Sequence, residues 1–180
     1  MTAADNEAFI HDRLAHWERH LRNTIAAAPA PGTGRPLLVL GPLLDQLVAL
    51  RNLTSGLVED LRRDADSPPL TASAPGRDYL TRLAGALART AGAAAHLSTA
   101  VTALTESHQH AHHPDAAGLP AEQYLTVRLA HAAALRSLGR ALDTVTRPPA
   151  DPAACPAPAP VGEHVRTADA PPTQPARRRP

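Results

Sequence analysis

The chain has 180 residues, of which 43% are hydrophobic, 19% are charged and only 2% are aromatic. This composition is typical of a soluble globular domain, and the scarcity of aromatic side chains disfavours base-stacking nucleic-acid platforms, carbohydrate clefts and cofactor pockets. The net charge of +1 gives no field that would recruit nucleic acid or a membrane surface. A core of Leu and Ala suits close-packed helices better than strands, so we expect an all-α fold.

Two features of the sequence favour a cytoplasmic protein. The single cysteine, Cys155, has no partner for an internal disulfide, which fits a reducing compartment. The first residues lack the basic and apolar segments of a secretory signal, and no apolar run has the length of a membrane span. We therefore expect a cytoplasmic location and no membrane partner.

The first two helical segments differ in the strength of their patterns. The first is expected to run from an N-cap at Asp5 to about residue 28. The second repeats leucine at steps of three and four over residues 40–61, which places these leucines on one stripe of a helix. We expect this helix to start near Pro36, to be kinked at Gly41 and Pro42, and to be the most deeply buried element.

The second half of the chain shows two further helices. Residues 64–76 contain prolines and a glycine, and they are expected to form a loop. From Arg77 to His108 apolar residues keep a heptad spacing, which predicts a third long helix. After another loop, Pro120 is expected to open a fourth helix that ends at Arg147.

Four long helices joined by loops predict an all-α, antiparallel up-down-up-down four-helix bundle over residues 1–147. Residues 148–180 are rich in Pro and Ala and have no apolar period, so we expect a disordered tail. The tail closes on Arg177, Arg178 and Arg179. These three charges are either solvated or make a weak, salt-sensitive contact with phosphate or an acidic partner.

Four histidines, His108, His110, His112 and His113, lie in one short segment. Imidazole is a ligand for zinc, nickel and copper, and a loop can adapt its geometry to such an ion. The alternative is a solvated helix end, where imidazole also sits comfortably. The tract therefore leaves open a metal-binding or metal-responsive protein.

Two further histidines, His16 and His20, stand one turn apart on the first predicted helix, with Glu18 between them. A zinc-protease helix needs glutamate directly after its first histidine, where this chain has Trp17. We therefore expect these histidines to flank a buried stripe.

Histidines also interrupt the third and fourth helices. His131 falls within the apolar face of the fourth helix, so we expect a buried neutral side chain with a hydrogen-bond partner across the bundle. His96 lies opposite the leucines of the third helix, where a histidine phosphotransfer domain presents its acceptor. The following Leu97 and Ser98 do not fit that pattern, and a small phosphotransfer module is kept as a third hypothesis on fold analogy alone.

The leading hypothesis comes from the third helix, which has no charged residue between Thr90 and Thr105. The face opposite its leucines is made of small residues: Gly85, Ala88, Gly92, Ala95 and Thr99. Small residues allow close helix approach, although such a face also tolerates water. We expect a non-enzymatic interaction or scaffolding protein, without a cofactor, that binds a protein partner or self-associates here.

Overall fold

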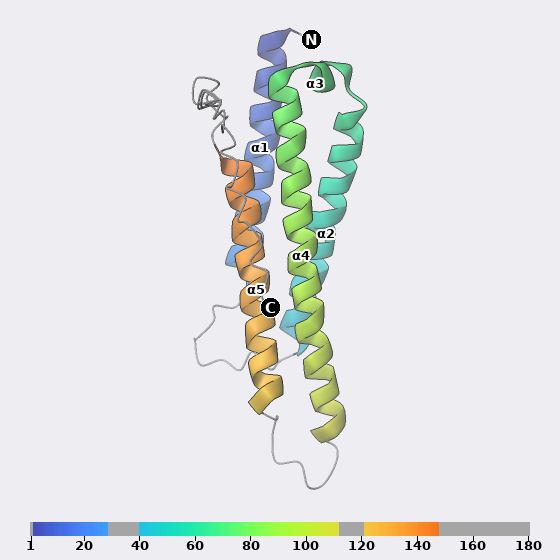
Figure 1. Ribbon diagram of the computed structural model, residues 1–180, viewed down its shortest axis with the longest axis vertical. Helices are drawn as coiled ribbons and strands as arrows, with labels where there is room; N and C mark the ends of the chain where they lie inside the picture. Colours follow the sequence, from blue (N-terminus) through green and yellow to red (C-terminus); the bar gives the residue numbers. More distant parts are fainter. Residues whose placement is uncertain (1, 29–39, 112–120, 148–180) are drawn as a thin grey trace, which may run out of the picture. The chain divides into compact units, whose positions relative to one another are not determined.

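The computed structural model describes residues 2–28, 40–111 and 121–147, with side chains in the last turn of the middle range left out after residue 106. Every regular element in these ranges is a helix (Figure 1). The helices are α1 (Ala3–Ala26), α2 (Leu40–Ala65), α3 (Pro68–Ala72), α4 (Ala74–Ala111) and α5 (Ala121–Thr146). The predicted all-α class is confirmed for these residues, and none of their helices is long and apolar enough to cross a membrane.

Several expectations fall outside the described residues. They are the helix start near Pro36, the helix opening at Pro120 and the disordered tail over residues 148–180. Within the described part, α2 begins at Leu40, so Pro42 stands in its first turn, where its missing N–H leaves no intrahelical bond unmade.

Helix α1 begins earlier than predicted because Thr2, not Asp5, is its N-cap. The Thr2 hydroxyl accepts a hydrogen bond from the Asp5 backbone N–H at 3.2 Å, and the Asp5 carboxylate accepts one from the Thr2 N–H at 2.8 Å. This reciprocal capping box satisfies two donors that the helix start leaves free. The bond from the Thr2 backbone N–H to the carboxylate, followed by the nearby Thr2 hydroxyl, lowers the pKa of Asp5.

The predicted loop over residues 64–76 is wrong over most of its length. Helix α2 continues to Ala65, the short helix α3 joins α2 to α4 (Figure 1), and α4 begins at Ala74 rather than at Arg77. Pro68 and Pro69 are the first two residues of α3, where proline is well tolerated. Helix α4 follows almost at once. A β-carbon at Gly76 would lie 2.1 Å from the Leu70 carbonyl oxygen, so only glycine permits this close approach.

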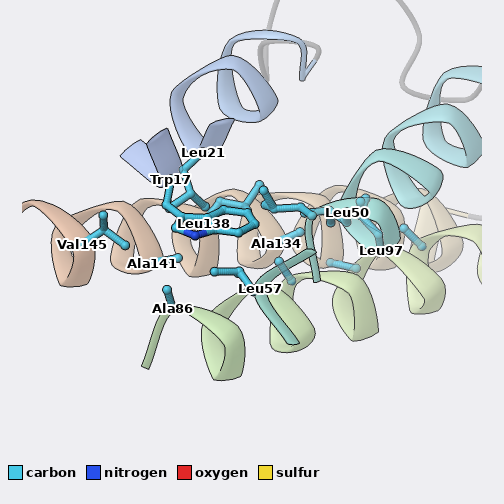
Figure 2. Packing of buried hydrophobic residues seen from close by; sticks show 14 of the residues in the cluster. Trp17, Leu21, Leu50, Leu57, Ala86, Leu97, Ala134, Leu138, Ala141 and Val145 are labelled. Carbon is cyan, nitrogen blue, oxygen red and sulfur yellow. The ribbon is translucent and has the colours of Figure 1, made fainter. Parts of the chain in front are cut away.

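Helix α4, rather than α2, makes the most contacts with other helices, first with α5 and then with α2. Helix α1 packs mainly on α5. The core between them is built largely of Leu and Ala, with Trp17 and Tyr79 as its large aromatic members. Figure 2 shows Trp17 and Leu21 of α1 lying close to Leu138 of α5.

The contact between α4 and α5 depends on small residues of α4. A β-carbon at Gly85 would meet the Thr144 methyl at 3.0 Å, and one at Gly92 would meet the Ser137 hydroxyl at 3.5 Å. Residue numbers rise along one helix as they fall along the other, so α4 and α5 run antiparallel. Near the end of α5, the guanidinium of the buried Arg82 donates to the Arg147 carbonyl.

Candidate functional site

A buried polar network joins α1 to α2 around Asp60. The Trp17 indole N–H donates to Asp60 Oδ2 at 3.1 Å, and the Arg13 guanidinium forms an ion pair with the same oxygen. Arg63 Nη1 lies 3.4 Å from Asp60 Oδ1. Both carboxylate oxygens are therefore engaged, which compensates for the burial of the charge.

The next turn of α2 holds a second buried carboxylate, Asp64. The Tyr79 hydroxyl of α4 donates to Asp64 Oδ2 at 2.5 Å, and both residues are buried. Burial and this bond raise the pKa of Tyr79 above its ordinary value, because both favour the neutral phenol. The two carboxylates thus tie α2 to α1 and to α4, and both oxygens of Asp60 are held by protein donors, so we interpret the network as structural.

Among the described residues, two other buried polar side chains have no hydrogen-bond partner. His131 is 0% exposed and neither ring nitrogen has a partner, so the predicted cross-bundle bond is absent. Burial lowers the pKa of His131, because the charged imidazolium is disfavoured in an apolar core. Gln46 of α2 is also buried, with neither amide atom paired.

An open groove of about 520 Å³ runs between α2 and α4. It is lined by Arg51, Thr54, Ser55, Val58, Glu59, Ala91 and Ala94. The exposed large hydrophobic residues of α2 are Leu44, Val48 and Val58. Leu44 and Val48 lie one turn apart, whereas Val58 comes ten residues after Val48, with the exposed Arg51 and Ser55 between them on this side of the helix. We refer to Leu44, Val48 and Val58 together as the interrupted apolar stripe of α2.

The structure divides the small-residue face predicted on the third helix. Gly85 and Gly92 are half-buried and lie toward α5, so their small size serves the contact within the chain. Ala88, Ala95 and Thr99 are exposed. These three residues continue from the Ala91 wall of the groove onto the outer surface of α4.

The side chains of the predicted histidine tract lie outside the part of the chain that the structure describes. His108 and His110 belong to the last turn of α4, and their side chains are not described. His112 and His113 lie outside the described residues, as do Arg177, Arg178 and Arg179. Within the ranges that are described, no group of three or more His, Cys, Asp or Glu side chains could hold a metal ion.

The other histidines considered as sites, His16, His20 and His96, lie within the described residues. His16 is half-buried and His20 is exposed, and their ring centroids are 4.4 Å apart. Burial, His20 and Arg13 all lower the pKa of His16. His96 is exposed on α4, and no groove described here is lined by it.

Sequence reasoning missed Gln46, Asp60 and Asp64, although a signal for them exists. The buried line of α2 runs through Leu43, Gln46, Leu50, Leu53 and Leu57 and continues to the two aspartates at the same spacing. The predicted leucine stripe instead included Thr54 and Leu61, which are only half-buried. The helical spacing of these buried positions was visible in the sequence, but the spacing does not show which residues of other helices contact a polar side chain on that line.

No family model, characterised protein or solved structure matches the chain. The function must therefore be argued from the surfaces and side chains described above.

Proposed function

We propose that the protein is a non-enzymatic helical interaction protein that self-associates through the face formed by α2 and α4. The observation that carries this proposal is the interrupted apolar stripe Leu44, Val48 and Val58, of which Val58 lines the groove between α2 and α4. Val48 is 57% exposed. Large apolar side chains grouped on one face favour association more than scattered ones do.

The fold offered for this role is an antiparallel up-down-up-down bundle of α1, α2, α4 and α5, followed by a tail over residues 148–180. Support comes from pairs that link the helices in order: Trp17 with Asp60, Tyr79 with Asp64, and Gly85 with Thr144. Such a bundle satisfies its core internally and leaves outer helix faces free for a partner.

A second copy of the chain suits the α2 face because its charges are self-complementary. Arg51 and Glu59 flank Ser55 on one side of α2, four residues away in each direction. In a two-fold dimer with Ser55 at the axis, Arg51 of each copy faces Glu59 of the other. Glu59 is exposed and makes only 3.7 Å contacts with Arg62 and Arg63, which leaves it available.

The test is the mass of the full chain measured by sedimentation equilibrium over a range of concentrations. We expect reversible dimers for the native protein and monomers for Val58→Asp, because Val58 lines the groove one turn from Ser55 and a charge there must be desolvated. Leu129→Asp is the control, since Leu129 is an exposed large hydrophobic residue like Val58 but lies on α5. A native monomer at all concentrations, or equal loss in both variants, contradicts the proposal.

A charge exchange tests the two-fold arrangement. Arg51→Glu places like charges opposite each other and weakens the dimer, whereas the double variant Arg51→Glu with Glu59→Arg restores the pairing. Failure of the double variant to recover the affinity lost in the single one would exclude Ser55 as the axis.

A further inference from the structure

His16 and His20 form a close imidazole pair on α1. Their ring centroids are 4.4 Å apart and their planes are inclined at 56°. The edge of the His16 ring also packs on Trp17, with centroids 5.3 Å apart. His16 is thus held in place, while His20 is exposed and free to adjust.

The separation of the two rings fits a shared metal ion. With a metal–nitrogen distance of about 2.0–2.1 Å, the centre of a coordinated imidazole lies about 3.2 Å from the ion. When the nitrogen–metal–nitrogen angle is a right angle, the centroids of the two rings are about 4.5 Å apart, whereas a tetrahedral angle at the metal separates them by about 5.2 Å. The observed 4.4 Å corresponds to the right angle of square or octahedral coordination, which Cu²⁺ and Ni²⁺ prefer.

We propose that His16 and His20 together bind a divalent transition-metal ion, Cu²⁺ or Ni²⁺, as two adjacent ligands of its coordination sphere. The remaining positions are taken by water, since no third protein ligand converges there among the described side chains. Of the nearby cationic groups, Arg13 is compensated by Asp60 and Arg22 by Glu18 at 2.6 Å, while Arg19 also lines the depression beside His16. An open surface depression of about 680 Å³ beside His16 gives the ion access.

The chain carries its own reporter for this site, because Trp17 is its only tryptophan. Its ring centroid lies 5.3 Å from that of His16 and 5.9 Å from that of His20. A bound Cu²⁺ ion quenches indole fluorescence at such short range. Ala86 of α4 belongs to the same core cluster as Trp17 (Figure 2). At a rise of 1.5 Å per residue, the histidine tract over residues 108–113 begins about 30 Å further along α4 than Ala86.

The experiment titrates the full chain with CuCl₂ and follows the fluorescence of Trp17. We expect saturable quenching with one equivalent of Cu²⁺ in the native protein. Because loss of an outer-shell contact already costs ten-fold or more in metal affinity, loss of a ligand in His20→Ala should weaken the apparent affinity by at least about ten-fold. His20 is exposed, so this variant keeps its fold, which circular dichroism verifies.

Two controls separate this site from others. His11→Ala removes an exposed histidine of α1 and should leave the quenching curve unchanged. Alanine at His108, His110, His112 and His113 should also leave it unchanged. Quenching that survives His20→Ala, or that disappears only in the tract variant, overturns the proposal, and neither result depends on whether the chain dimerises.

Discussion

The unpaired His131 in the core makes a strong prediction about stability. Its side chain is 0% exposed and both ring nitrogens lack partners. A buried polar group without a hydrogen bond costs about 1–3 kcal/mol, whereas an apolar side chain of similar size carries no such cost. We therefore expect His131→Leu to raise the free energy of unfolding by about 1–3 kcal/mol near neutral pH.

The same substitution should change the response to acid. Burial holds the pKa of folded His131 below its ordinary value of 6.5, so below pH 6.5 the unfolded chain binds a proton that the folded chain does not. The stability from neutral His131 is present above pH 6.5 and is lost as the pH falls. The slope approaches about 1.4 kcal/mol per pH unit until the folded pKa is reached.

Urea unfolding followed by circular dichroism, at about pH 7.5 and about pH 5.5, measures both effects. The gap between His131→Leu and the native protein should widen at the lower pH. His16 also has a lowered pKa, but it is present in both proteins and cancels in the difference. The exposed His96 provides the control variant His96→Leu. A gap that stays constant between the two pH values would refute the assignment of acid sensitivity to His131.

Two further predictions concern packing and the polar network. A β-carbon at Gly56 would lie 2.9 Å from Trp17 Cη2, so Gly56→Ala should lower thermal stability by about 1–3 kcal/mol. Gly139 has open space around it, so Gly139→Ala should raise thermal stability by about 0.5–1 kcal/mol. Equal shifts in calorimetry would contradict this contrast. Tyr79→Phe removes the bond to Asp64 and should cost about 1.5–3 kcal/mol in urea unfolding. Because the folded pKa of Tyr79 is raised, the native protein should also lose stability as the pH rises above 10. If the stability of Tyr79→Phe falls with the same slope above pH 10, Tyr79 does not make this contribution.

The helices themselves were largely predictable. The second helix ends at Ala65, two residues into the predicted loop over residues 64–76, and the fourth ends one residue before Arg147. Helical periodicity and proline positions act over a few residues, so they can be read locally. The first helix was misplaced at its start because Thr2 and Asp5 both suit an N-cap, and the reciprocal bonds between them selected Thr2.

The candidate sites were less predictable. The tight contacts of Gly85 and Gly92 with α5 depend on a partner helix, so the sequence showed their small size but not what they face. His16 and His20 were visible as a pair one turn apart. Their ring separation, however, depends on side-chain orientations that packing against Trp17 sets.

The sequence by itself determined that this chain forms long amphipathic helices with a leucine and alanine interior, because apolar period and composition are properties of each segment alone. Only the tertiary structure decided which side of each helix is covered. It turned Asp60 toward Trp17, left His131 unpaired and exposed Val48. These outcomes depend on the register between helices, which is set by contacts between residues far apart in the chain.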